Sequence, residues 1–451
     1  MPGFSPKLLT SARFFYWFLA LVTLYRVLSL LQPHLVLFYD EAQYYHWSLD
    51  PDWGYYSKPP MVAWFIWLSS QVLGPTPFAI KLASPLLYGA SALLVYAMGC
   101  QLFQRRTALL AGWIFSTSTL VGYNSLFITT DAPLIFFWCL TLWGFLQALE
   151  HDRLKYWVLA GLFCGLGMLS KYTMAALPGS IFLYLLVDSE RRKRLHGVGP
   201  WLAAILAGLI FATNLWWNWQ NGFVAFRHTS EISGVGNGVF PGRLLEFVVA
   251  QFAVFGPVWM YLLLRYLWEQ RKSLFRHGDC LLHFASLPLL LVICLQALFS
   301  HAYINWAAPA YVGASLLLAN WLQQRVGLLA IGGLVNLCLL SLFYHWPLLA
   351  DSVGFERSKS SDPWFRVLGY DQVGYQLADA LVQEPQLLLA SPSRKLLAAV
   401  GYYADPLQVR GVRWEENAQE VQDYYDQRFN LELYQGQEQQ AFLLLIEQAA
   451  P

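Results

Sequence analysis

Residues 129–149 read TTDAPLIFFWCLTLWGFLQAL, in which one acid, Asp131, precedes an uncharged apolar run. A helix needs about 20 mostly apolar residues to cross the hydrocarbon core of a bilayer, and the run 132–149 approaches that length. The Asp-Ala-Pro at its start also suits a helix N-terminus with Asp131 as the capping residue. We therefore predict a membrane-spanning helix that begins beside a carboxylate.

Runs of the same kind lie on both sides of this one. The 451 residues are 57% hydrophobic and 13% charged, whereas a soluble domain carries about 25% charge. We therefore expect an all-α polytopic membrane protein, and we take the first run as a retained span rather than a cleaved signal. The predicted spans, eleven in all, lie near residues 12–31, 79–102, 107–124, 132–149, 156–170, 174–188, 200–217, 244–267, 280–299, 303–321 and 327–346.

Basic residues are distributed unevenly between the two sets of connections. If the N-terminus is cytoplasmic, the short outer connections contain only Lys58, Lys171, Arg227 and Arg243. The inner connections contain Arg105, Arg106, Arg153, Lys155, Arg191, Arg192, Lys193, Arg194, Arg271, Lys272, Arg276 and Arg325. Such an excess on one side is typical of cytoplasmic loops, so we predict a bacterial inner (plasma) membrane protein with its C-terminal tail outside.

Two segments do not fit the pattern of spans. The run 61–74 is too short to cross comfortably and, as a span, would destroy the charge asymmetry, so we predict an interfacial helix there. Residues 348–451 are richer in polar residues, and we expect a small extracytoplasmic α/β domain after a transmembrane domain of residues 1–347. Its predicted strands are 386–390 and 441–446 and its helices 393–402 and 416–428. We give this domain little mechanistic weight beyond covering the site or meeting an acceptor.

Composition also excludes several classes of function. A net charge of +1 gives no basic surface for nucleic acid. The six cysteines lie within or at the ends of apolar runs and none has a C-x-x-C spacing, so we expect neither a disulfide framework nor a thiolate metal site.

The predicted topology gathers polar residues at the outer face. The first outer loop, 32–61, contains Asp40, Glu41 and Lys58, while Asp131 and Lys171 lie at the outer ends of later spans. Charged side chains cost about 2.5–3.5 kcal/mol each within a membrane, so a cluster of them indicates mutual compensation or a charged ligand. Further candidates for binding a substrate are Tyr56, Tyr172, Arg227 and His228.

These residue types suit a sugar phosphate carried on a lipid. Lysine and arginine bind phosphate, and a carboxylate near a hydroxyl can accept its proton. Structural alternatives exist for each group: Asp40 and Asp131 suit helix caps, Glu41 a helix N-terminal charge, and Lys171 a lysine that reaches the lipid headgroups. Lys58 before Pro-Pro also suits an exposed turn, and Arg227-His228 a charged surface.

Four short motifs carry a family resemblance. Asp40-Glu41-Ala42-x-Tyr44, Ser57-Lys58-Pro59-Pro60, Thr130-Asp131-Ala132-Pro133 and Leu169-Ser170-Lys171 resemble the family 39-type membrane glycosyltransferases, which include protein O-mannosyltransferases and lipid A aminoarabinose transferases. The resemblance runs in order over residues 10–320 and continues more weakly in 362–369 and 394–403. It implies the GT-C fold.

The resemblance also implies roles for the matching residues. Asp40 would activate or orient the acceptor, Asp131 would be a second functional acid, and Lys58 and Lys171 would hold the carrier phosphate. Aminoarabinose transferases have a metal-binding acid directly before Lys-Pro, where this chain has Ser57. We therefore carry over neither a metal nor lipid A as acceptor, and the cofactor stays open, a divalent metal included.

We predict a glycosyltransferase that moves a sugar from a polyprenyl-monophosphate donor to a lipid, glycan or protein acceptor at the outer face. One alternative is a transporter or flippase of a lipid-linked saccharide, although no inverted repeat supports it. Another is a polymerase or ligase that uses a lipid diphosphate donor.

Overall fold

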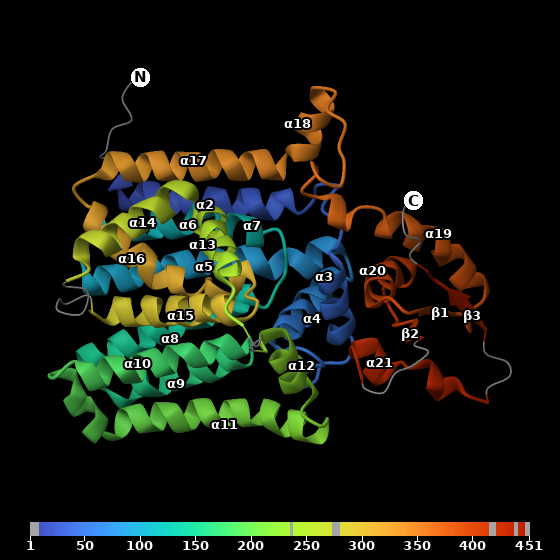
Figure 1. The fold of residues 1–451 in the computed structure, drawn as a ribbon, viewed down its shortest axis with the longest axis horizontal. Coiled ribbons are helices and arrows are strands. Elements are labelled where there is room, and N and C mark those ends of the chain that lie inside the picture. The colour runs from blue at the N-terminus through green and yellow to red at the C-terminus, as the bar shows by residue number, and fades with distance from the viewer. Residues whose placement is uncertain (1–8, 235–237, 273–279, 415–420, 437–440, 447–451) are drawn as a thin grey trace.

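The structure is a computed structural model that describes residues 9–234, 238–272, 280–414, 421–436 and 441–446. Long helices run side by side and form a bundle, and the segment after residue 347 packs at one end of it (Figure 1). The helices of the bundle are α2 (Ala12–Ser29), α5 (Pro77–Leu102), α6 (Arg105–Ser116), α7 (Thr119–Asn124), α8 (Asp131–His151), α9 (Leu154–Met168), α10 (Ala176–Val187), α11 (Val198–Gln220), α13 (Pro241–Phe255), α14 (Pro257–Gln270), α15 (Cys280–Phe299), α16 (Ala310–Leu322) and α17 (Val326–Tyr344).

Each of the eleven predicted runs falls on one of these helices or on a consecutive pair. Within the described residues, six helices are long and apolar enough to span a membrane alone, and α13 with α14 makes a seventh if the bent pair is one span. The other runs fold as shorter helices. A mostly helical membrane bundle is thus confirmed, while the count of eleven spans stays a prediction.

Two runs that we predicted as single spans are each divided into two helices. The run 244–267 divides at Gly256 into α13 and α14, which are bent by 117°. Gly256 has φ 108°, a conformation that favours glycine, and Pro257 cannot donate the next helical hydrogen bond. The run 107–124 divides in the same way, since Ser118 caps a new helix through the backbone N–H of Val121.

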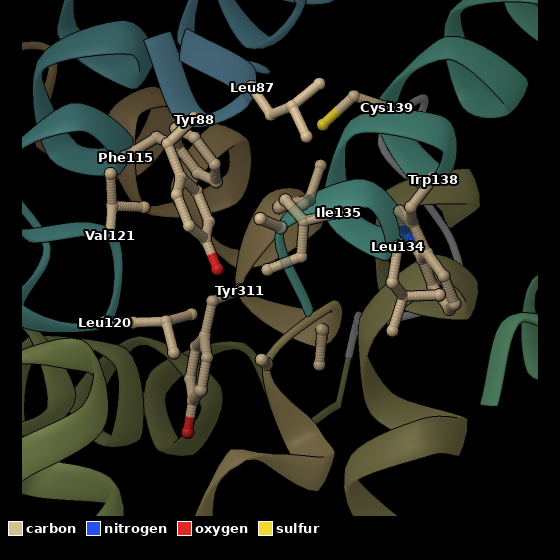
Figure 2. Packing of buried hydrophobic residues seen from close by; sticks show 14 of the residues in the cluster. Leu87, Tyr88, Phe115, Leu120, Val121, Leu134, Ile135, Trp138, Cys139 and Tyr311 are labelled. Carbon is tan, nitrogen blue, oxygen red and sulfur yellow. The ribbon is translucent and has the colours of Figure 1, made fainter. Parts of the chain in front are cut away.

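Bulky aromatic and aliphatic side chains fill the centre of the bundle. Figure 2 shows Tyr88 of α5, Ile135 of α8 and Tyr311 of α16 among the side chains packed together there. Between α9 and α11 the backbones approach closely instead. A Cβ on Gly161 would lie only 2.5 Å from the carbonyl oxygen of Ala203, so a glycine is needed at this position. Small residues allow such close approach of helices in membranes.

Shorter elements cover the end of the bundle where the first outer loop was predicted. Helix α4 (Met61–Leu73) has 13 residues and is about 20 Å long, too short to span about 30 Å of hydrocarbon. An interfacial helix is therefore consistent with its length. The remaining short elements at this end are α3 (Tyr39–Ser48), α12 (Val224–Ser233), α18 (Trp346–Ser352) and the 3-10 turns η1 (Tyr172–Ala175) and η3 (Ile304–Ala307); η2 (Arg191–His196) lies between α10 and α11.

The segment after residue 347 contains a three-stranded parallel sheet of order β2-β1-β3. In register, Ala390 of β1 lies opposite Val412 of β2 and Leu444 of β3. Its elements are η4 (Phe365–Val367), α19 (Tyr370–Gln383), β1 (Leu388–Ser391), α20 (Arg394–Ala404), β2 (Gly411–Arg413), α21 (Tyr424–Arg428), η5 (Leu431–Tyr434) and β3 (Phe442–Leu444). The predicted helix 416–428 is shorter than expected, because it begins at Tyr424, and residues 416–420 lie outside the described residues. The division into two domains at 347/348 stays a prediction.

Tyrosine hydroxyls attach this segment to the first outer loop. Tyr403 of α20 accepts a hydrogen bond from the backbone N–H of Leu37 at 2.8 Å. Tyr45 of α3 donates to the carbonyl of Pro406 at 2.6 Å, and Tyr402 donates to that of Pro75 at 2.8 Å. Helix α20 is therefore held against α3, next to the acids of the first outer loop.

Candidate active site

A polar cavity of about 380 Å³ lies where α3, α8, α12 and α20 meet. It is lined by Tyr39, Asp40, Gln43, Tyr44, Tyr56, Ser57, Lys58, Thr129, Thr130, Asp131, Lys171, His228, Ile232, Tyr303, Asn305, Trp306, Arg394, Gln422 and Asp423. The structure thus brings six of the predicted site residues together: Asp40, Asp131, Lys58, Lys171, His228 and Tyr56.

Asp131 is a buried and fully engaged carboxylate. It is the first residue of α8, where the helix dipole favours negative charge, and only 1% of it is exposed. Its Oδ1 accepts from Lys171 Nζ at 2.6 Å, and its Oδ2 accepts from the side-chain amide of Asn305. Thr130 is the capping residue, so our alternative reading of Asp131 as a cap was wrong by one position. Because both oxygens have donors, Asp131 is suited to orienting charge rather than to taking a proton.

Asp40 is the more accessible acid. It is the second residue of α3, which Phe38 precedes as the capping position, so Asp40 is not the helix cap. Its Oδ1 accepts from Arg394 Nη1 at 3.0 Å, and 36% of its side chain is exposed. No described residue bonds to its second oxygen, Oδ2. This oxygen is therefore free to accept a proton from a substrate hydroxyl.

Lys58 has no carboxylate partner among the described residues. Its backbone is fixed by two hydrogen bonds to Tyr55, of 3.0 and 3.3 Å, in a tight turn before Pro59 and Pro60. Burial, and next the charge of Lys171, lower the pKa of Lys58 to about 8. The charges of Asp40 and Asp131 oppose this shift only in part, so a half-buried ammonium group beside another cation favours an anionic ligand.

His228 and Tyr56 form an aromatic wall. Their ring centroids lie 5.2 Å apart, and the hydroxyl of Tyr56 donates to the carbonyl of Val421 at 3.2 Å. Burial, with the charge of Lys58 second, lowers the pKa of His228 to about 4. The imidazole is therefore neutral at neutral pH and offers a hydrogen bond rather than a charge.

Three predicted residues lie outside the cavity. Glu41 is 2% exposed and accepts from Lys81 Nζ of α5 at 2.6 Å, so it does not reach a substrate in this cavity. Tyr172 bonds through its hydroxyl to Asn214 of α11 at 3.1 Å. Arg227 is exposed on α12. We therefore correct their placement: Glu41 and Tyr172 brace the walls of the site, and Arg227 lies on the surface.

Arg394 is the main residue that the sequence pattern did not identify. It is the first residue of α20, and its Nη1 bonds to Asp40 and, at 2.8 Å, to the side-chain oxygen of Gln43. In the sequence it lies in the stretch 394–403, where the family resemblance is weak, and in the segment to which we assign little mechanistic weight. The structure corrects that judgement, because a cation from this segment contacts the accessible acid of the cavity.

The donor atoms of the cavity do not form an evident metal site. Among the described residues, no group of three or more His, Cys, Asp and Glu side chains is arranged to hold a metal ion. Ser57, which lines the cavity, stands where aminoarabinose transferases have an acid. We therefore assign no step to a metal.

Comparison with known proteins places the chain in a family. The dolichyl-phosphate-mannose-protein mannosyltransferase family model matches residues 57–217. The lipid A galacturonosyltransferase RgtD of Rhizobium johnstonii is 30% identical over 91% of this chain and 86% of its own length. The undecaprenyl phosphate-alpha-4-amino-4-deoxy-L-arabinose arabinosyl transferase of Pectobacterium carotovorum is 30% identical over 64% of this chain, which spans only 54% of that relative.

Solved structures show the same fold. ArnT from Cupriavidus metallidurans bound to undecaprenyl phosphate superimposes with a TM-score of 0.61 at 17% identity, covering 88% of this chain and 76% of that one. The oligosaccharyltransferase of Archaeoglobus fulgidus gives a TM-score of 0.53 at 14% identity, covering 85% of this chain and 61% of that one. The chain therefore belongs to the family of membrane glycosyltransferases with the GT-C fold that includes the lipid A galacturonosyltransferase.

Proposed function

We propose that this glycosyltransferase moves a sugar from a polyprenyl-monophosphate donor to a hydroxyl of a lipid acceptor. The observation that carries the proposal is that one cavity holds Asp40, whose Oδ2 has no hydrogen-bond partner among the described residues, and Lys58, which forms no ion pair with any of them. The names of two relatives, one for lipid A and one for undecaprenyl phosphate, support a lipid as the acceptor and a lipid as the carrier of the donor sugar.

The proposed reaction is a direct displacement. The acceptor hydroxyl attacks the anomeric carbon while Asp40 Oδ2 takes its proton. The bond between that carbon and the phosphate oxygen breaks, and its electron pair leaves with the polyprenyl phosphate. Lys58 and Lys171 stabilise the departing phosphate, and Asp131 keeps Lys171 in place through their 2.6 Å ion pair. A single displacement inverts the configuration at the anomeric carbon.

The test uses purified enzyme in lipid nanodiscs with synthetic polyprenyl-phosphate sugars, galacturonic acid and aminoarabinose first. We expect Asp40→Asn to lower turnover by about a hundredfold or more, the usual contribution of a general base. Asp131→Asn should also lower it, because the Lys171 ammonium loses its ion-pair partner. Undiminished turnover in both variants would contradict the mechanism. Activity with a diphosphate-linked donor alone would contradict the monophosphate donor.

We also propose eleven crossings, a cytoplasmic N-terminus, and an extracytoplasmic C-terminal domain of residues 348–451. The alternating chain direction of the bundle helices supports this topology (Figure 1). The basic connections between α5 and α6, α8 and α9, α10 and α11, and α16 and α17 support it too, since they join helices at the end away from α3. Arg276 of the predicted inner set lies outside the described residues. Labelling of single cysteines from either side of the membrane would test the topology.

A further inference from the structure

A second and larger hollow, of about 660 Å³, adjoins the polar cavity. We call it the α7–α17 groove, because α7, the α13–α14 break, α17 and residues 363–367 form its walls. Its walls are mostly apolar, with Leu120, Val254, Leu340 and Phe343 among them. Such a surface suits a hydrocarbon chain.

The groove meets the cavity on the side of the acids. Asp40, Tyr44, Thr129 and Asn305 line both hollows, so they are continuous. Neither Lys58 nor Lys171 lines the groove. A molecule that lies in the groove therefore reaches Asp40 without passing the cations that we assign to the donor phosphate.

The groove is also exposed at two of its walls. Tyr123 of α7 is 46% exposed and Leu339 of α17 is 43% exposed, and both line it. In a bilayer these side chains face lipid rather than water, so a chain can enter sideways from the membrane.

Residues 363–367 form one end of the groove, and this end carries a positively charged side chain. Arg366 lines the groove, its side chain is exposed, and no described residue forms a hydrogen bond or ion pair with it. The start of η4 is anchored to α17 by Trp364, which is 1% exposed and donates from its indole to the carbonyl of Phe343 at 3.1 Å. Arginine at such a place binds phosphate through paired N–H groups.

We propose that the α7–α17 groove is the binding site of the acceptor, an acylated lipid with a phosphate on its headgroup. An acyl chain lies in the groove, the headgroup phosphate binds Arg366, and the acceptor hydroxyl lies at Asp40 Oδ2. The proposal rests on the proposed function and adds the location and chemical class of the acceptor. It also separates the two lipids, because the lysines that we assign to the donor phosphate line the cavity and not the groove.

Two leucines of α17 provide a matched pair for the test. Leu339 lines the groove, whereas Leu342 does not, and they are 43% and 45% exposed. We expect Leu339→Trp to fill the groove and raise the KM for lipid A by about tenfold. A tenfold change corresponds to the loss of apolar contact between roughly two methylene groups of the acyl chain and the groove. The KM for the donor, and turnover with a deacylated lipid A headgroup, should stay unchanged. Leu342→Trp should behave as wild type.

Arg366 is tested with lipid A before and after phosphatase treatment. Arg366→Gln should raise the KM for the phosphorylated lipid only, and Arg366→Lys should recover part of the loss. A rise in the donor KM in Leu339→Trp, or an equal effect of Leu342→Trp, would overturn the proposal. So would equal sensitivity of the two lipid A forms to Arg366→Gln.

Equilibrium binding of lipid A without donor keeps this test separate from that of the proposed function. If wild type binds lipid A and Leu339→Trp does not, the groove is its site, whichever donor supplies the sugar. If both bind equally, the groove proposal fails even where transfer from the polyprenyl-phosphate sugar is intact.

Discussion

Glu41 of α3 and Lys81 of α5 form a buried ion pair of 2.6 Å. The same carboxylate accepts from the backbone N–H of Phe38 at 2.9 Å and from that of Ile128 at 2.8 Å. It thus connects the start of α3, which carries Asp40, to the segment just before Asp131. We infer that this pair fixes the separation of the two acids.

The first prediction concerns that pair. Glu41→Gln leaves the Lys81 ammonium buried without its counter-charge. Lys81→Met likewise leaves the Glu41 carboxylate buried without a positive partner. We expect each single variant to lose about 3–5 kcal/mol of stability, the usual cost of breaking a buried pair. Thermal unfolding in detergent, followed by circular dichroism, would measure the loss.

The double variant Glu41→Gln/Lys81→Met is the control. Because it removes both charges, it should be more stable than either single variant. If the stability loss of the double variant equals the sum of the two single losses, the Glu41–Lys81 ion pair does not contribute to stability, and the prediction is wrong.

The second prediction concerns pH. The pKa of Lys58 is lowered to about 8, first by burial and then by Lys171. If Lys58 holds the donor phosphate as proposed, donor binding needs its ammonium form, so kcat/KM for the donor should fall as pH rises through about 8 and be level just below that value. The phosphodiester of the donor does not titrate in this range. Initial rates at low donor concentration between neutral and alkaline pH would measure the profile.

Lys58→Arg is the matched control, because arginine stays protonated throughout this range. The alkaline fall should disappear in it, even if its activity is lower at every pH. An unchanged fall would assign the titration to another group.

The third prediction concerns Arg394. Arg394→Gln removes the cation from Asp40, and both side chains are more than a third exposed, so the interaction is worth about 1 kcal/mol. We expect kcat/KM to fall by about fivefold, with partial recovery in Arg394→Lys. Lys395→Gln, which removes the adjacent cation outside the cavity, should have no effect. Equal losses in Arg394→Gln and Lys395→Gln would point to surface charge in general.

The fourth prediction concerns metal ions. The sequence resemblance implies that Ser57 replaces a metal-binding acid of aminoarabinose transferases, and the described residues form no cluster of metal ligands. We expect turnover to survive dialysis against a chelator. A loss that added divalent cations restore would contradict this and would direct attention to ligands supplied by the substrate phosphate.

Much of the bundle follows from the sequence because lipid imposes a simple rule. Apolar runs must form helices that satisfy their own backbone, so the positions of α5, α8 and α11 are readable from hydropathy alone. The bend at Gly256 was not predicted, since it depends on packing. A Cβ at Gly256 would lie 2.2 Å from Asn336 of α17, a contact between residues far apart in sequence.

The site was predictable to the extent that topology fixes it. Asp131 and Lys171 lie at span ends, and Asp40 and Lys58 lie in the loop that joins the first two spans, so the alternation of spans alone brings them to one face. We predicted Glu41 in the site because it shares a motif with Asp40. Successive residues of a helix point in different directions, so Glu41 points to Lys81 and not into the cavity. Arg394 was missed because no local pattern ties it to α3.

The bond between Arg394 and Asp40 joins residues 354 positions apart. A growing chain inserts its bundle helices one after another, yet Arg394 leaves the ribosome only after every one of them. A nascent or prematurely terminated chain thus has the membrane part of the cavity but an incomplete set of charges. Asp40 therefore gains this partner only after residues as late as 394 have been translated and packed against α3.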